Sequence, residues 1–164
     1  MNKIFEKLTN QLTETIDSSV ALALHNKNQE VEVIHLLWAL LSNTNSVLNQ
    51  LLNKMNVNKV AVELEAKSYA SKLPSVSSVT KESIKLSRNL LSSLQSAEGL
   101  MASFGDKFIA VDTWLISNLD SSVIKDVLGK YVDLKEAKKE LEAMRAGKTI
   151  DSNSGDENLE ALNK

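Results

Sequence analysis

The feature that most constrains the fold of this 164-residue chain is an internal duplication. Apolar residues of the first half recur in the second half at a constant offset of 78 residues, as in the pairs Leu8/Leu86, Leu12/Leu90, Ile16/Leu94, Leu37/Leu115 and Leu41/Leu119. After a slip of two residues the match continues at an offset of 76, where Val47-Leu48 aligns with Val123-Ile124. Self-similarity at a fixed spacing predicts repeated structural units. Because each unit has one apolar face, the two units must pack together to bury it.

The two halves also place their predicted elements in the same order, which favours duplication over a chance match between aliphatic helices. Each runs from a long helix through a polar loop to two short apolar helices. Helical spacing of apolar residues predicts helices over residues 8–25, 31–42, 47–52, 60–73, 80–94, 111–119, 122–130 and 134–144, with Thr80 as a possible helix cap. We therefore expect an all-α fold of about eight helices in two pseudo-symmetric repeats, residues 1–73 and 80–146.

Composition supports long helices and an aliphatic core. Hydrophobic residues make up 43% of the chain but aromatic residues only 4%, so Leu, Val, Ile and Ala must fill the interior. A single proline and five glycines give little turn punctuation, which disfavours many short strands. The absence of cysteine excludes disulfides, thiolate metal sites and cysteine nucleophiles.

Charge and hydropathy narrow the possible partners. With 19 basic and 21 acidic residues the chain lacks the clustered basic surface that nucleic-acid binding requires. The N-terminus turns polar too early for a signal peptide. The longest apolar run, Val33 to Leu41, is far shorter than the ~20 residues of a membrane span. We expect no nucleic-acid partner, no membrane partner and a cytoplasmic location.

Residues 147–164 differ in character from the rest of the chain. They carry two lysines against four acidic residues, and Asp151 to Asp156 is polar throughout. Such a segment buries too little apolar surface to order itself. We therefore expect a flexible linker over residues 147–164.

No motif for catalysis or for cofactor binding stands out. Gly147-Lys148-Thr149 resembles the end of a phosphate-binding loop, but Glu142 stands where that motif needs its first glycine. His25 and His35 are not spaced to place two metal ligands on one helix face, and His35 lies in an apolar run typical of a core histidine with one hydrogen bond. We expect no catalytic residues, no metal and no cofactor in this domain. A small helical hydrolase or metal protein is a minor alternative, because triad residues meet only in space.

Recognition of another polypeptide is the function that remains. An apolar groove between two helices can hold an extended or helical segment of a partner. The loop from Gly105 to Ile109 and the helix that starts near Val111 place Asp106 and Asp112 beside such a surface. These acids have structural alternatives, since Asp112 can cap a helix and Asp106 can shape a turn; both kinds of role are compatible.

Three segments, in their order and spacing, resemble the Clp N-terminal repeat domain family: Leu8-Thr9-Asn10, Val31 to Leu41, and Gly105 to Asp112. The resemblance covers residues 1–146, and it implies that residues 147–164 are a linker that leads toward an ATPase module. The connector from Lys72 to Val76 and the Gly-Asp-x-Phe-Ile loop are more similar to the disaggregase branch of the family than to its protease-linked branches. Asp112, Thr113 and Trp114 depart from the family pattern, as does Val33 where a proline is usual.

The resemblance implies the N-terminal domain of an ATP-dependent disaggregase that engages unfolded or aggregated polypeptides through a groove between the repeats. The parent would be a homohexamer that uses ATP and magnesium and works with the DnaK chaperone system. The alternative is an adaptor- or substrate-docking domain of a protease-linked unfoldase. Carried over residue by residue, the polar substrate contacts fall on Thr9, Asp106 and Asp112, and the apolar groove on Leu12, Leu90 and Leu94.

Overall fold

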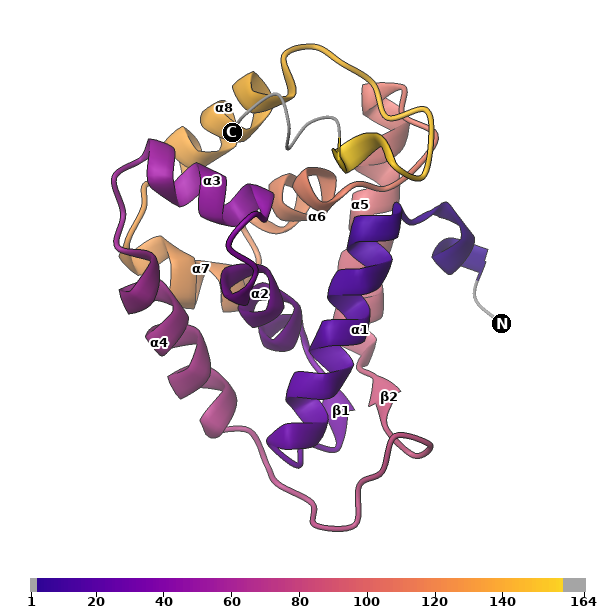
Figure 1. The fold of residues 1–164 in the computed structure, drawn as a ribbon, viewed down its shortest axis with the longest axis vertical. Coiled ribbons are helices and arrows are strands. Elements are labelled where there is room, and N and C mark those ends of the chain that lie inside the picture. The colour runs from indigo at the N-terminus through magenta and orange to yellow at the C-terminus, as the bar shows by residue number, and fades with distance from the viewer. Residues whose placement is uncertain (1–2, 158–164) are drawn as a thin grey trace.

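The duplicated sequence folds into two copies of one four-helix unit. The structure, a computed structural model, describes residues 3–157. The first unit holds α1 (Asn10–His25), α2 (Val33–Ser42), α3 (Val47–Lys54) and α4 (Lys59–Ser71), and the second holds α5 (Arg88–Phe104), α6 (Val111–Asn118), α7 (Ser122–Val127) and α8 (Leu134–Arg145) (Figure 1). Short elements complete the described chain: the 3-10 helices η1 (Lys3–Lys7) and η2 (Leu128–Lys130), and the strands β1 (Glu30–Val31) and β2 (Lys85–Leu86). The all-α prediction with about eight helices is confirmed.

The long first helix of each unit starts at an equivalent cap. The Thr9 hydroxyl accepts a hydrogen bond from the backbone N–H of Leu12, and 78 residues later the Ser87 hydroxyl accepts one from Leu90. Each bond satisfies one of the free N–H groups at a helix start. The expectation that Thr80 caps this helix is wrong, because Thr80 to Ile84 forms a turn and the helix begins at Arg88.

The two units are joined by a reciprocal pairing of their backbones. Leu8 pairs with Ile109, and Val31 pairs with Leu86. The offset of 78 converts one pair into the other, since Leu8 corresponds to Leu86 and Val31 to Ile109. The N–H of Thr9 donates to the Ile109 carbonyl at 3.0 Å, and that of Ser87 donates to the Val31 carbonyl at 2.9 Å. This pairing also explains why the predicted helices at residues 8, 31 and 80 began too early.

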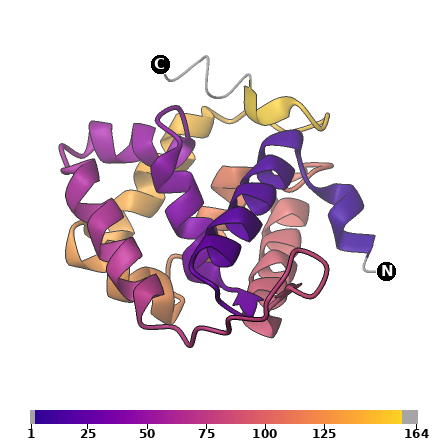
Figure 2. The ribbon, with the colours of Figure 1, turned by 60° about the horizontal axis from the view of Figure 1, so that its bottom comes forward.

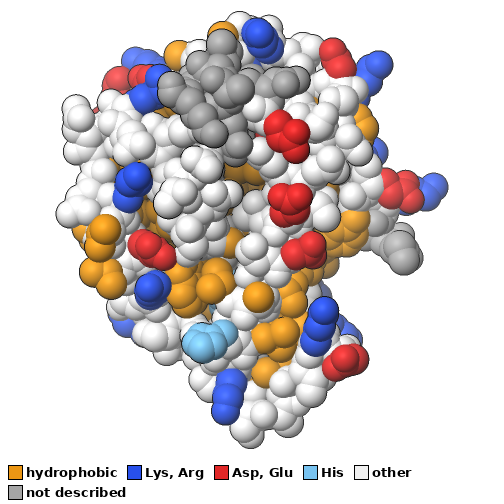
Figure 3. Space-filling model, in the orientation of Figure 1, with side chains coloured by type: hydrophobic (Ala, Val, Ile, Leu, Met, Phe, Trp, Pro, Cys, Tyr) orange, Lys and Arg blue, Asp and Glu red, His pale blue; other side chains and the backbone are white. Residues whose placement is uncertain are grey.

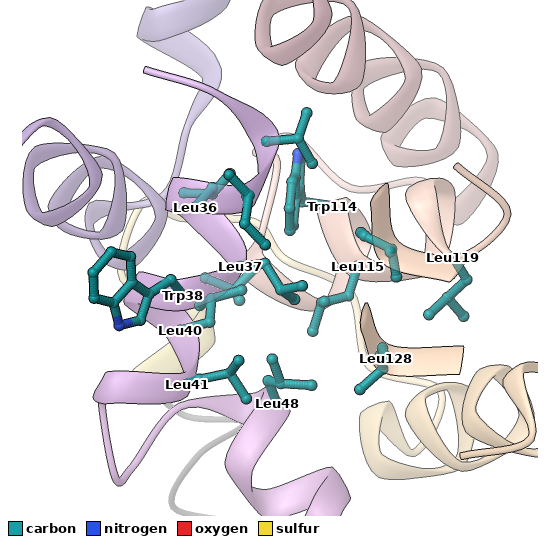
Figure 4. Packing of buried hydrophobic residues seen from close by; sticks show 14 of the residues in the cluster. Leu36, Leu37, Trp38, Leu40, Leu41, Leu48, Trp114, Leu115, Leu119 and Leu128 are labelled. Atoms are coloured by element: carbon teal, nitrogen blue, oxygen red, sulfur yellow. The ribbon is translucent and has the colours of Figure 1, made fainter. Parts of the chain in front are cut away.

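The second helix of each unit lies at the centre of the core. Every residue of α2 from Val33 to Leu41 is buried, which is typical of a helix surrounded by protein. Figure 4 shows the equivalent side chains Leu37 and Leu115 pointing toward each other between α2 and α6. The surrounding side chains are mainly leucine, valine, isoleucine and alanine, as composition predicts. No helix within residues 3–157 has the length and apolarity to cross a membrane.

His35 is a structural residue of the first unit. Its Nδ1 accepts from the N–H of Glu32 at 2.8 Å, and its Nε2 lies 2.9 Å from Oδ1 of Asn28. The ring therefore makes two hydrogen bonds, one more than expected. Burial lowers its pKa to about 4. Asn28 in turn donates to the carbonyl of Pro74, so this network ties the connector between the units to the start of α2.

Residues 147–157, the first part of the segment expected to be a flexible linker, lie against the folded units, while residues 158–164 lie outside the described part. We call residues 147–157 the C-terminal segment. It is drawn in yellow in Figures 1 and 2, beside the N-terminal end of α1. Ile150 is 1% exposed and Asp156 4% exposed. Its composition is polar, but one buried isoleucine and several hydrogen bonds to the folded units hold it in place.

Candidate functional site

The candidate site lies where the N-terminal ends of α1 and α6 meet. α1 contributes its cap Thr9, the loop before α6 contributes Asp106, and the first turn of α6 contributes Asp112. All three side chains are buried. The Thr9–Ile109 backbone bond described above holds the start of α1 against the segment that leads into α6. The structure thus brings the three polar residues predicted for substrate contact into one region.

Arg145, at the C-terminal end of α8, neutralises the two acids. Its Nε and Nη2 bind the two carboxylate oxygens of Asp112 at 2.9 and 2.6 Å, and its Nη1 binds Asp106 at 2.5 Å. The two-pronged bond to Asp112 is the strongest geometry available to a guanidinium and a carboxylate. Burial alone lowers the pKa of Arg145, but Asp112 and Asp106 outweigh it and raise the pKa above its usual value.

The arginine is further fixed by two neighbours. Its Nη2 donates to the Thr113 hydroxyl at 2.9 Å, and its guanidinium carbon lies 4.7 Å from the centre of the Phe104 ring. A guanidinium over an aromatic face gains a favourable cation–π interaction. With Arg145 only 5% exposed, the cluster connects α8, the loop before α6 and α6 itself into one buried ion-paired unit.

The leucines predicted to line an apolar groove lie elsewhere. Leu12, Leu90 and Leu94 are 0% exposed. They belong to the continuous core that joins the two units. Apolar side chains at these helix positions are more stable inside than in water, so in this structure they present no surface to a ligand.

The surface of the site is covered by the C-terminal segment. Asp106 uses its second carboxylate oxygen to accept from the N–H of Ile150 at 2.8 Å, and the N–H of Lys107 donates to the Ile150 carbonyl at 2.8 Å. A few residues later the N–H of Asn10 donates to the Asn153 carbonyl at 2.7 Å. The segment therefore runs across the site and is bound largely through its own backbone.

The segment ends at the start of α6, which lacks a cap of its own. Its N-cap residue is Ala110, whose side chain offers no hydrogen bond. Asp156 supplies the missing acceptor, with Oδ2 2.9 Å from the N–H of Val111. A carboxylate at a helix N-terminus also gains from the helix dipole. Burial nevertheless raises the pKa of Asp156 to about 6, against the opposing effects of the Val111 N–H and the nearby Thr9 hydroxyl.

A polar groove of about 340 Å3 continues from this site along α1, with Val111 as a shared wall. Gln11, Glu14 and Thr15 form its α1 side, and the loop before α3 forms the opposite side. Figure 3 shows acidic side chains gathered over α1 on this face. The open groove and the covered site together form one crevice that borders the first half of α1.

The polar side chains of the site are engaged with one another and with backbone groups. Among residues 3–157, no three histidine or acidic side chains are placed to hold a metal ion. The buried acids are engaged by Arg145 and by backbone N–H groups. What the arrangement offers is a row of backbone and side-chain hydrogen-bonding groups for an extended polypeptide.

Sequence reasoning missed three residues of this site: Arg145, Ile150 and Asp156. Arg145 and Arg88 are the only arginines in the chain, so an isolated arginine among the lysines of α8 was an available signal. Arginine is preferred for buried pairing with carboxylates. Ile150 is the only large apolar residue between Gly147 and Asp156, which was a weaker signal for docking.

Comparison with known proteins agrees with this fold. The sequence model of the Clp repeat (R) N-terminal domain matches residues 7–131. The chaperone protein ClpB of Wolinella succinogenes is 55% identical over 98% of the chain, and that of Helicobacter hepaticus is 52% identical over 98%. The chain spans only 19% of the length of each of these relatives.

Two solved structures share the fold at low sequence identity. The Hsp104 N-terminal domain from Candida albicans superposes with a TM-score of 0.82 at 21% identity, covering 92% of this chain and 99% of that one. The N-domain of ClpV in complex with a VipB peptide superposes with a TM-score of 0.68 at 18% identity, covering 88% and 91%. The fold and the site together define a duplicated helical domain of the Clp type. The chain belongs to the Clp repeat (R) N-terminal domain family.

Proposed function

We propose that this chain is the N-terminal, substrate-engaging domain of a ClpB-type disaggregase and that it binds unfolded or aggregated polypeptides. One observation carries the proposal: the site between the units already holds a stretch of polypeptide, residues 150–156, through hydrogen bonds to its backbone at Ile150 and Asn153. Recognition through the backbone is tolerant of sequence, which suits a protein that must engage many unfolded chains.

The comparisons support this choice of parent. The relatives at 52–55% identity carry the name chaperone protein ClpB, which favours a disaggregase over the protease-linked alternative. A related ClpV N-domain has been solved with a VipB peptide. We place Thr9, Asp106 and Asp112 at the substrate site, with Arg145 as the residue that positions the two acids.

The remaining functions belong to the proposed parent rather than to this domain. In that parent, ATP and magnesium would be used by modules outside this chain. The parent would act as a homohexamer in the cytoplasm together with the DnaK system. The domain itself would contribute binding and no catalysis.

A chemical-shift titration tests the binding function. The 15N-labelled chain is titrated with a reduced, carboxymethylated and therefore permanently unfolded protein. We expect the amides of Asn10, Lys107 and Val111 to shift, with a dissociation constant in the micromolar to millimolar range because a small site must order its ligand. The same protein in its native, disulfide-bonded form is the control. Shifts confined to other surfaces, or none at all, would rule out this site.

A further inference from the structure

The C-terminal segment is bound in the manner expected of a ligand. Its backbone is paired at Ile150 and Asn153 with groups from the loop before α6 and from α1. Its single apolar side chain, Ile150, packs with Phe108 and Ala110, and its Asp156 carboxylate completes the start of α6. These contacts involve the elements that carry Thr9, Asp106 and Asp112.

The segment also has a shape suited to this seat. Gly155 lies so close to Ile150 that an added Cβ would stand 2.7 Å from Cγ2 of the isoleucine. A larger residue at position 155 therefore collides with Ile150 in the docked form. The atoms that its Cβ would meet belong to Ile150 and not to α1–α8. The segment folds against itself as well as against the site.

We infer that residues 148–156 are an internal competitor that occupies the substrate site and must leave before an external polypeptide can bind there. The inference rests on the proposed function and adds regulation of the same site. It also defines the chemistry of a good external ligand: a segment with a branched aliphatic side chain that packs with Phe108 and Ala110 and a carboxylate that accepts from the Val111 N–H. Such a ligand would form the same contacts with the site that the C-terminal segment loses when it leaves.

The energetic consequence is a reduced apparent affinity. When only a fraction of molecules has a free site, the apparent dissociation constant is the intrinsic one divided by that fraction. Removing the burial of Ile150 or the bond of Asp156 raises the free fraction, so binding of an external chain tightens. We expect about a tenfold gain when both contacts are removed.

The main experiment compares full-length variants. Ile150→Ser combined with Asp156→Ala releases the segment, and Gly155→Leu releases it by a steric route. Asp151→Ala is the matched control, because Asp151 is exposed in the same segment and bonds only to Thr149. Sharp, random-coil amide signals for residues 149–156 establish release, and titration of the carboxymethylated protein measures affinity. Release with unchanged or weaker binding would overturn the inference.

A reversible lock tests the opposite direction in one protein. The chain contains no cysteine, and Asn10 and Asn153 are exposed residues whose backbones are hydrogen-bonded at 2.7 Å. That pairing places the two positions within reach of a disulfide. We expect Asn10→Cys/Asn153→Cys to bind the unfolded protein several-fold more weakly when oxidised than when reduced. Equal binding in the two states would overturn the inference.

A peptide separates failure of this inference from failure of the proposed function. A synthetic peptide of residues 148–157 is added to the released double variant, with a peptide lacking the isoleucine and the final aspartate side chains as control. Shifts at Asn10, Lys107 and Val111 with the first peptide alone support occupancy of the site, even if the unfolded protein binds nowhere. If the unfolded protein binds wild type and released variants with equal affinity, the inference of an internal competitor is rejected, whereas the proposed binding function is retained.

Discussion

The starts of α2 and α6 are equivalent positions in the two units, yet they are completed in different ways. At α2, Glu32 and His35 satisfy each other's backbone groups within one turn, and Asn28 holds the histidine from the preceding loop. At α6, the residue equivalent to Glu32 is Ala110, which has no side chain to offer. The acceptor for the Val111 N–H comes instead from Asp156, 45 residues further along the chain than Val111.

This difference shows how a symmetric fold supports an asymmetric site. One unit completes the start of its central helix with local residues, because the N–H of Glu32 donates to the His35 ring within the same turn. The other unit leaves its helix start to be filled from outside and surrounds it with Asp106, Asp112 and Arg145. Recognition is expected only at the second of these positions, and the following predictions probe that contrast.

The largest effect is expected from Arg145→Met. This change leaves Asp106 and Asp112 buried without their cation, and breaking a buried ion pair on one side costs about 3–5 kcal/mol. Urea denaturation measures the loss in the free energy of unfolding. Arg88→Met is the matched control because Arg88 is exposed, and we expect it to change stability by less than about 0.5 kcal/mol. Equal effects of the two substitutions would contradict the role assigned to the cluster.

The closed start of α2 should weaken in acid. The pKa of His35 is about 4 in the folded chain, against an ordinary histidine pKa of 6.5, so between these values the unfolded chain binds the additional proton. Stability therefore falls as pH falls from about 6.5 to about 4, by up to about 3 kcal/mol from this residue. His35→Gln should be less stable at pH 7 but should lose this pH dependence. Exposed His25→Gln should retain it, as urea titrations at successive pH values will show.

The start of α6 should respond to acid in the opposite sense. The pKa of Asp156 is about 6 when the segment is docked, against an ordinary aspartate pKa of 3.8, so the docked segment binds the additional proton between these values. Docking therefore strengthens as pH falls, by about tenfold between pH 7 and pH 5. The other charged groups of this site are Asp112, Asp106 and Arg145, and Asp112 adds to the upward shift.

Hydrogen exchange of the Ile150 and Val111 amides measures this docking. Wild-type protection should rise on acidification after correction for intrinsic exchange rates. Asp156→Asn, which keeps an oxygen acceptor but cannot titrate, should show protection independent of pH. A wild-type segment that loosens in acid would contradict the assignment.

The smallest contrast is between the two first-helix caps. Ser87→Ala and Thr9→Ala each remove one cap and should each cost about 1 kcal/mol of unfolding free energy. Only Thr9→Ala should also weaken docking of the C-terminal segment, because only Thr9 stands near Asp156. Equal protection of the Ile150 amide in both variants would remove Thr9 from the site.

The sequence was sufficient for the helices and for the duplication because both depend on apolar spacing. It also singled out Asp106 and Asp112, which the structure places together. The sequence did not reveal strands β1 and β2, because a strand of two residues is too short to show an alternating pattern. As a result Leu86 was assigned to a helix although it pairs with Val31.

The rest of the site depends on contacts between distant residues. Arg145 meets Asp112 and Asp106 across 33 and 39 residues, and although a lone arginine among the lysines of α8 is a signal of pairing, it does not identify these partners. The C-terminal segment has the composition of a linker, and composition does not report hydrogen bonds that a backbone makes with a particular surface. The leucines Leu12, Leu90 and Leu94 were recognised as apolar, but periodicity does not distinguish the core from a groove.

Because Leu8 pairs with Ile109 and Val31 pairs with Leu86, the two units of this single chain are related like the subunits of a two-fold symmetric dimer. In each unit, the residues just before the first helix form backbone hydrogen bonds with the other unit. A lone unit would expose unpaired backbone at both of these places and would be driven to find a second copy of itself. The two units should therefore melt together in one cooperative transition, with no folded half-molecule on the way.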